Sequence, residues 1–285
     1  TDWESLSGEF ASTPAAITIG VFDGLHRGHL ALIREVVDTP HMAVVVTFQR
    51  HPTEVLLHDS VPGFIMSLGQ KRRMLRELGV DIGVIIDFNE RFRRVPGREF
   101  LDRLAASFDL RRLVVGHDFR CGYRLDTDIG VIREHFHNRG VEVISVEPVE
   151  DGSGPVSSTR VRGLVMDGEI EAAARLLGRP YVLDLTHEQI EHDNGRAYVV
   201  KGRGDLLQES SQLLPPPGRY TAVGHAAAPA AEPPETDDPA RQAGHRQAEQ
   251  EMELEIGENS LSWPLAAGES IRYIVVKDRR FLSKE

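Results

Sequence analysis

The chain has 285 residues, of which 40% are hydrophobic and 27% charged, a composition typical of a globular protein with room for two modest domains. Its single cysteine, Cys121, excludes an internal disulfide and a metal site built from cysteines. The longest apolar stretches, such as 42–48, are far too short to span a membrane, and the first residues lack the basic and then apolar composition of a signal peptide. We therefore expect a cytoplasmic protein without a membrane partner.

The net charge of −11 is concentrated in one segment. Residues 229–259 contain nine acidic side chains and two arginines, a net charge of −7, so the rest of the chain carries only −4. The charge of the main body therefore does not exclude a polyanionic substrate, whereas no basic patch interleaved with aromatic residues indicates a nucleic-acid partner. Residues 226–250 are rich in Ala, Pro, Glu and Gln and predict a flexible insertion.

A junction near the N-terminus carries two histidines three residues apart. Residues 17–22 are apolar and predict a strand, and residues 28–38 place apolar side chains on one helical face. Glycines at positions 20, 24 and 28 permit a tight turn and the close approach of a ligand, and the first N–H groups of the helix favour an anion. The junction therefore predicts a phosphate site.

His26 and His29 are the candidate chemical groups of this junction. Each imidazole can donate a hydrogen bond to a phosphoryl oxygen and, when protonated, can stabilise negative charge in a transition state. A structural alternative is that His26 only caps a turn and His29 only packs at the start of the helix. The glycine-rich sequence in front of the pair favours the phosphate site.

Short runs rich in β-branched residues alternate with amphipathic helical patterns over the first part of the chain. This alternation predicts a doubly wound α/β fold, in which helices cover both faces of a parallel sheet. Ligands of such folds bind beyond the carboxyl ends of the strands, where the strand order reverses. After the first strand and helix, we expect strands at 42–48, 81–88, 113–116 and 141–146 and helices at 68–78, 98–108 and 159–166.

The periodicity changes beyond Tyr181. Short alternating runs separated by Gly and Pro predict a small antiparallel barrel or sandwich. The expected strands of this second region are 181–185, 197–200, 220–223, 252–256 and 271–276.

Five short segments stand out in order along the chain: Gly20–His29, Thr47–Pro52, Val115–Gly122, Val156–Arg162 and Leu177–Tyr181. The first has the form Gly-x-Phe-Asp-Gly-x-His-x-Gly-His, and it resembles the signature of the nucleotidyltransferases that carry an HxGH motif. Together the five resemble the FMN adenylyltransferase module of the prokaryotic bifunctional riboflavin kinase/FAD synthetase family. The resemblance covers roughly residues 15–185, and it implies a doubly wound α/β domain over residues 1–185.

The resemblance also implies that the chain uses ATP and Mg²⁺ to adenylate FMN. It assigns His26 and His29 to the phosphate oxygens of the transition state and Arg162 to the departing β- and γ-phosphates. Phe48, Arg50 and Pro52 would border the flavin. The residues that it assigns to ATP binding are Gly20, Phe22, Asp23, Gly24, Asp118, Ser157, Ser158 and Thr159, of which Asp118 would contact the metal or the ribose.

Ordinary structural roles remain open for three of these residues. Ser157 could cap a helix, Arg162 could form a surface salt bridge, and Asp118 could cap a turn. The chain also departs from the family pattern on the flavin side, where Arg50 replaces a proline and Thr127 replaces a glycine.

Residues 186–285 partly resemble the riboflavin kinase barrel of the family. Between positions 205 and 212, however, the chain lacks the Gly-Phe-Pro-Thr-Ala-Asn motif that holds the metal and the ATP phosphates in that kinase. The resemblance therefore implies an FAD synthetase that has lost its kinase activity. Three alternatives stay open: a bifunctional enzyme with an unrecognised kinase motif, a non-catalytic flavin- or nucleotide-binding regulatory protein, and a transferase with another phosphorylated acceptor. The sequence does not indicate an oligomeric state.

Overall fold

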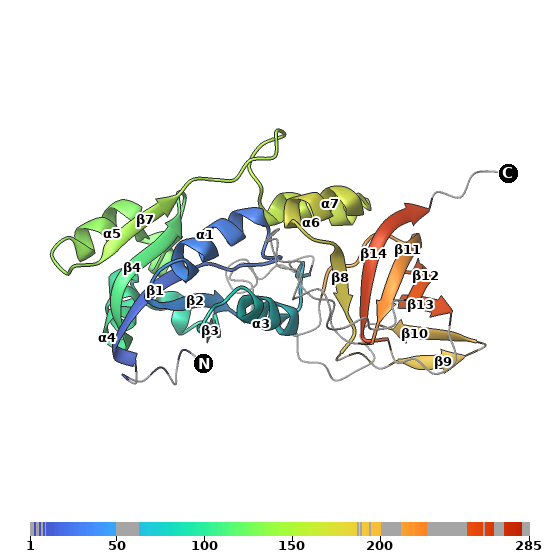
Figure 1. Ribbon diagram of the computed structural model, residues 1–285, viewed down its shortest axis with the longest axis horizontal. Helices are drawn as coiled ribbons and strands as arrows, with labels where there is room; N and C mark the ends of the chain where they lie inside the picture. Colours follow the sequence, from blue (N-terminus) through green and yellow to red (C-terminus); the bar gives the residue numbers. More distant parts are fainter. Residues whose placement is uncertain are drawn as a thin grey trace. The chain divides into compact units, whose positions relative to one another are not determined.

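The computed structural model divides the chain into two compact units: the first is Thr1–Val61 with Lys71–Val156, and the second is Pro62–Gln70 with Ser157–Glu285 (Figure 1). The expected domain boundary at residue 185 stays a prediction. None of the described helices is both long and apolar enough to cross a membrane. The structure describes residues 3, 6, 8, 10–49, 63–186, 188, 190–193, 195–200, 212–226, 250–258, 260–264 and 271–280.

The first unit is built on a parallel sheet of five strands in the order β3-β2-β1-β4-β7. This arrangement confirms the expected doubly wound α/β fold. The strands are β1 (Phe10–Ile19), β2 (Met42–Phe48), β3 (Ile82–Ile86), β4 (Phe108–Gly116) and β7 (Glu142–Val146). The helices are α1 (Arg27–Val37), α3 (Leu68–Glu77), α4 (Gly97–Ser107) and α5 (Ile129–Phe136), with the short elements η2 (Phe92–Arg94), β5 (Arg120–Cys121), η3 (Tyr123–Leu125) and β6 (Thr127–Asp128).

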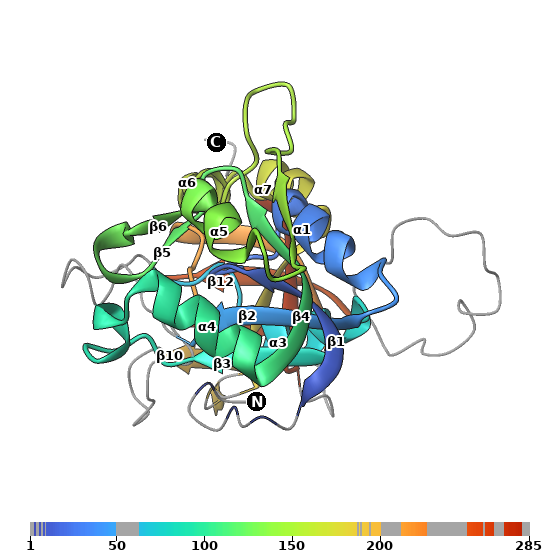
Figure 2. The same cartoon turned by 90° about the vertical axis from the view of Figure 1, so that its left-hand side faces the viewer.

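Alternation along the strands gives the sheet two apolar faces. In β1, Ala15, Ile17 and Ile19 pack in one core cluster with Leu101 and other side chains of α4. Ala16 packs on the opposite face with Val36 of α1 and Val114 of β4. Figure 2 shows α1 and α4 on opposite sides of the sheet. Because both faces are covered, the stretches 15–19 of β1 and 43–47 of β2 are continuously buried, as is typical of parallel sheets.

The strand order reverses between β1 and β4, which are neighbours in the sheet but distant in the sequence. Loops that follow these two strands therefore lie at the carboxyl edge of the sheet, at the switch point where α/β folds bind ligands. The segment 20–26 follows β1, and the segment beginning at His117 follows β4.

The bounds of β1 and β4 differ from the sequence prediction for a physical reason that the structure shows. β1 begins at Phe10 and ends at Ile19, whereas the apolar run predicted a strand over 17–22. The strand ends early because Phe22 has a left-handed backbone conformation, with φ of 50°, that no strand accommodates. α4 passes directly into β4 at Phe108, whose backbone is already extended, so β4 is longer than the predicted strand 113–116.

The second unit contains a curled antiparallel sheet of seven strands in the order β8-β14-β11-β12-β13-β10-β9 (Figure 1). This half-barrel confirms the expected antiparallel class of the second region. Its elements are α6 (Ser158–Asp167), α7 (Ile170–Leu177), β8 (Tyr181–Asp184), β9 (Glu191–Asp193), β10 (Arg196–Val200), β11 (Gly218–His225), β12 (Gln250–Ile256), β13 (Ser260–Pro264) and β14 (Tyr273–Arg280). The predicted insertion at 226–250 lies, apart from its two end residues, outside the described residues.

A polar network explains why residues 62–70 belong to the second unit. The hydroxyl of Ser67 donates to Oδ2 of Asp184 at 2.5 Å, and the amide of Gln70 donates to the carbonyl of Val182 at 3.0 Å. The buried amide of Gln212 donates to the carbonyls of Ile65 and Val182 at 3.0 and 2.6 Å. These bonds pair buried polar groups of residues 62–70 with those of β8 and Gln212, as a well-packed interior requires.

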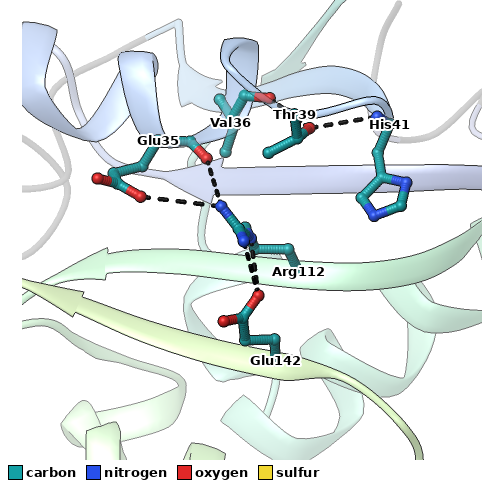
Figure 3. Close-up of polar contacts among 6 residues, drawn as sticks. All are labelled: Glu35, Val36, Thr39, His41, Arg112 and Glu142. Atoms are coloured by element: carbon teal, nitrogen blue, oxygen red, sulfur yellow. Dashed lines mark hydrogen bonds and ion pairs between the residues drawn. The ribbon is translucent and has the colours of Figure 1, made fainter.

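The carboxyl-terminal end of α1 is tied to the sheet by Arg112 of β4 (Figure 3). Nη1 of Arg112 donates to the carbonyl of Glu35 at 3.3 Å, and Nε and Nη2 lie 2.9 and 2.8 Å from Oε2 of Glu142 in β7. The hydroxyl of Thr39 donates to the carbonyl of Val36 at 2.8 Å and thereby closes the last turn. A cation that bonds the last carbonyls of a helix also interacts favourably with its dipole.

We predict that Arg112→Gln lowers the free energy of unfolding by about 1 kcal/mol, because the variant loses charge-assisted hydrogen bonds between three elements. Arg111→Gln is the matched control, since Arg111 pairs at 2.6 Å with Asp109 of its own strand. Its effect should stay within about 0.5 kcal/mol of the parent protein. Urea unfolding measures both, and equal losses in the two variants would contradict the role given to Arg112.

Candidate functional site

The loop between β1 and α1 is compact and strained. Phe22, Gly24 and Leu25 have φ values of 50°, 81° and 41°. Each non-glycine residue in the left-handed region costs about 1–2 kcal/mol, and such strain gathers at functional sites. Phe22 and Leu25 are also completely buried, so their packing offsets the cost of this backbone conformation.

Neighbouring β2 anchors the start of the same loop. The N–H of Gly20 donates to the carbonyl of Val46 at 3.0 Å, and the hydroxyl of Thr47 donates to the carbonyl of Val21 at 2.9 Å. The ring of Phe22 lies so close to Gly20 that a Cβ there would stand 3.0 Å from its Cζ atom. The loop therefore has one defined path from the strand to the helix.

His26 is the N-cap of α1. The N–H of His29 donates to Nδ1 of His26 at 3.3 Å, and the first helical hydrogen bond runs from the N–H of Leu30 to the carbonyl of His26. The capping alternative for His26 is thus present in the structure. It also has a chemical consequence, because a neutral ring that accepts through Nδ1 carries its proton on Nε2.

The two imidazoles of the motif lie against each other. Their ring centroids are 3.6 Å apart and the planes differ by 19°, while the edge of the Phe22 ring meets His29 at 5.2 Å. Gly28 makes this arrangement possible, since a Cβ at that position would stand 3.2 Å from the His26 ring and 3.4 Å from the carbonyl of Val156. The sequence spacing therefore brings His26 and His29 to one point at the helix start.

The N-terminus of α1 has the features of an anion site. Its first turn holds no acidic residue. Among the described residues, no hydrogen bond uses the N–H groups of Arg27 and Gly28. These donors and the positive end of the helix dipole favour a phosphate group.

Lys71 of α3 is a residue of this region that the sequence analysis missed. It is 3% exposed, and its Nζ donates to the carbonyl of Val21 at 2.9 Å. Burial lowers the pKa of Lys71 to about 8, although the negative charge of Asp23 acts in the opposite direction. Position 71 lies on the same helical face as the buried Met74 and Leu75, and this was the available signal.

The other predicted residues of the first unit lie at strand ends. Phe48 is half-buried at the end of β2, where its ring meets Phe88 at 5.7 Å and Phe92 at 6.4 Å. The Asp118 side chain is 82% exposed just after β4, and its Oδ1 lies 3.9 Å from Nδ1 of His117. Arg50 and Pro52 lie outside the described residues.

Cys121 is a half-buried residue of β5, paired with Thr127 in β6. Burial, with a further contribution from the charge of Asp126, raises the pKa of the Cys121 thiol to about 12. A thiol with such a pKa is not a nucleophile at neutral pH. Cys121 therefore contributes packing rather than chemistry.

Four predicted residues belong to the second unit, at the start of α6. The hydroxyl of Ser157 accepts the N–H of Arg160 at 3.3 Å, so Ser157 is the N-cap that the structural alternative expected. Ser158, Thr159 and Arg162 lie in the first turns of the same helix, and Thr159 is exposed. The structure thus groups these four residues in one unit and the two histidines in the other, and the ligand roles of all of them stay predictions.

The fold and the β1–α1 junction together define a nucleotidyltransferase-like α/β protein. The chain belongs to the FAD synthetase family, whose model matches residues 9–160. The curated relatives include the bifunctional riboflavin kinase/FMN adenylyltransferase of Escherichia coli strain K12, 31% identical over 172 residues, which are 59% of this chain and 55% of that protein. The chain therefore spans about half the length of that relative.

Two further relatives carry the same name. The Pseudomonas fluorescens protein is 35% identical over 169 residues, which are 58% of this chain and 54% of that protein. The Listeria monocytogenes protein is 28% identical over 219 residues, which are 74% of this chain and 68% of that protein. Among solved structures, a macrolide-efflux protein from Streptococcus pneumoniae matches with a TM-score of 0.75 at 23% identity, covering 96% of this chain and 88% of that one. At this identity the structural likeness shows the fold alone.

We predict that His26→Ala weakens the start of α1 by about 1 kcal/mol, because it removes the capping acceptor of the His29 N–H. His26→Asn is the matched variant, since asparagine is a favoured N-cap, and it should recover most of that loss. Hydrogen exchange of the His29 amide measures the local effect. Equally fast exchange in the two variants would show that capping is not what His26 supplies.

Proposed function

We propose that this protein is an FMN adenylyltransferase, which transfers AMP from ATP to FMN and releases pyrophosphate to give FAD. Membership of the FAD synthetase family and the three relatives named above support the reaction. The observation that carries the proposal is the stacked pair of His26 and His29 at the N-terminus of α1, at the switch point of the sheet.

The chemistry of this transfer makes modest demands on the protein. The phosphate of FMN is already an anion at neutral pH, so it can attack the α-phosphorus of ATP without a strong general base. What remains is to hold the two phosphates in line and to stabilise the charge that develops on their oxygens. A site of fixed donors is sufficient for this task.

The β1–α1 junction supplies such donors. His26 donates through Nε2, because its Nδ1 is engaged by the N–H of His29. His29 and the N–H groups of Arg27 and Gly28 add donors at the same helix start. We assign the two histidines to the phosphate oxygens of the transition state, and the loop residues Gly20, Phe22, Asp23 and Gly24 to the adenosine side.

The remaining predicted residues complete the proposal from other parts of the chain. Arg162 would neutralise the departing pyrophosphate, and the start of α6 with Ser157, Ser158 and Thr159 would steady the triphosphate. On the flavin side, the half-buried ring of Phe48 and its aromatic neighbours Phe88 and Phe92 offer a surface of the right chemistry for a flat ring. Arg50 and Pro52 belong to the same proposal by sequence alone.

Asp118 is the candidate protein ligand for Mg²⁺. Among the residues that the structure describes, no group of three or more His, Cys, Asp or Glu side chains could hold a metal ion. Mg²⁺ usually takes one or two carboxylates together with substrate phosphates and water, and the exposed carboxylate of Asp118 fits that donor set. When bound with ATP, the ion would neutralise part of the phosphate charge.

We further propose that the chain lacks riboflavin kinase activity. The support is the sequence at positions 205–212, which carries neither the threonine nor the asparagine of the family's kinase motif. Most of this segment lies outside the described residues, so the proposal rests on sequence.

We predict that incubation with FMN, ATP and Mg²⁺ yields FAD and pyrophosphate, and that His29→Ala lowers the turnover about 10²- to 10³-fold, the usual effect of removing one transition-state donor. His41→Ala is the control, because His41 lies at the far end of α1, before β2. Mass spectrometry of the products and pyrophosphate release measure both rates. Unchanged turnover in His29→Ala would refute the role of His29, and binding of FMN or ATP without turnover in the parent protein would instead identify a regulatory protein.

We predict that riboflavin with ATP and Mg²⁺ yields no FMN, because the chain lacks the residues that hold the metal and phosphate in the kinase. Chromatography with flavin fluorescence detects FMN at low conversion. A kinase-active relative assayed in parallel is the control. Formation of FMN would show that the protein is bifunctional and that other residues replace the motif.

A further inference from the structure

Lys71 places a buried ammonium group against the loop between β1 and α1. Lysine is almost never fully buried unless it is paired, yet Lys71 is 3% exposed. Its Nζ donates to the carbonyl of Val21 at 2.9 Å and to the hydroxyl oxygen of Thr47 at 3.4 Å. The carbonyl of Val21 also accepts the hydroxyl of Thr47, so one loop carbonyl receives two buried donors.

Charge strengthens this attachment. Asp23 is 1% exposed, two residues after Val21, and its negative charge acts on Lys71. A buried carboxylate without a compensating cation is costly, so the ammonium supports the loop by charge as well as by hydrogen bonding. Phe22, between the two contacts, holds its left-handed conformation while its ring packs against His29.

Resting on the proposed function, we propose that Lys71 is a positioning residue for ATP, whose ammonium holds the loop from Val21 to Leu25 in the conformation that presents His26 and His29 to the nucleotide. Lys71 acts through the carbonyl of Val21 and the charge of Asp23, and it does not itself touch the reacting atoms.

The proposal implies a pH dependence. Burial lowers the pKa of Lys71 to about 8, with Asp23 as the charged group that opposes the change. The other side chain that bonds Lys71, Thr47 of β2, carries no charge. The ammonium is therefore present at pH 7 and is lost as the pH rises through 8 to 9. Only about one tenth of the molecules keep it at pH 9, so the apparent affinity for ATP should fall about tenfold between pH 7 and pH 9.

If Lys71 only supported the fold, a rise in pH would change the free energy of unfolding, and in the favourable direction, rather than the affinity for ATP. The pKa of Lys71 in the folded protein is lower than the ordinary value of 10.5 that it has in the unfolded chain. Between pH 8 and pH 10.5 the unfolded chain therefore binds more protons than the folded protein, and this group makes the fold more stable as the pH rises. An affinity for ATP that falls with pH while the stability of the fold rises therefore distinguishes a positioning role of Lys71 from a purely structural one.

The experiment compares Lys71→Met with Arg72→Met, which removes one positive charge from an exposed position next to it on α3. At pH 7, Lys71→Met should raise the dissociation constant for ATP about 10- to 100-fold, the range expected for a hydrogen bond from a charged group, and its affinity should not change between pH 7 and pH 9. Arg72→Met should keep the parent affinity and the parent pH dependence. Unchanged affinity in Lys71→Met, or a pH dependence that persists in it, would overturn the proposal.

Two further measurements keep the test decisive. If Lys71→Met does not fold, Lys71→Arg replaces it in the experiment. Because arginine stays charged throughout this pH range, the affinity of this variant for ATP should not depend on pH. A pH dependence that survives in Lys71→Arg would overturn the proposal. If the parent protein forms no FAD, the proposed function fails, while the ATP titrations still test Lys71. If ATP does not bind at all, the proposal for Lys71 is overturned together with the proposed function, whereas ATP binding without FAD formation overturns only the function.

Discussion

The hydrogen bond from the N–H of His29 to Nδ1 of His26 fixes the geometry on which the rest of the site depends. It begins α1, sets the tautomer of the His26 ring and brings that ring onto the ring of His29. The chain can reach this cap only by a tight path after β1, and two buried residues, Phe22 and Leu25, adopt left-handed conformations to provide it. The strain and the cap are thus parts of one local solution.

The surrounding sheet supports this strained loop and the N-cap that follows it. Parallel strands with both faces covered give a rigid edge, and the loop is bonded to the neighbouring strand through Gly20 and Thr47. At the opposite end of α1, Arg112 joins the helix to β4 and β7. Both ends of the helix that carries the histidines are therefore attached to the same sheet, and the position of the imidazoles follows from the fold rather than from flexible side chains.

Hydrophobic periodicity was sufficient to predict the class of both units and the observed bounds of β2, and it placed α3 and β7 to within one residue of their observed ends. It misplaced the end of β1, because Val21 and Phe22 are as apolar as strand residues while the conformation of Phe22 is invisible to hydropathy. It also omitted α5, a helix of only eight residues that Asp128 caps. The sequence did not predict the role of Lys71, because a charged residue in an amphipathic helix is ordinarily expected to be exposed. Only its neighbours in the structure reveal the buried ammonium.

The thiol of Cys121 has a consequence of another kind. With a pKa near 12 it is protonated in nearly every folded molecule at neutral pH, and alkylating reagents require the thiolate. Modification of Cys121 is therefore expected to be slow while the short ribbon formed by β5 and β6, which follows β4 at the carboxyl edge of the sheet, keeps its packing. As the sole cysteine of the chain, it is a single-site reporter whose labelling rate follows the packing around this ribbon.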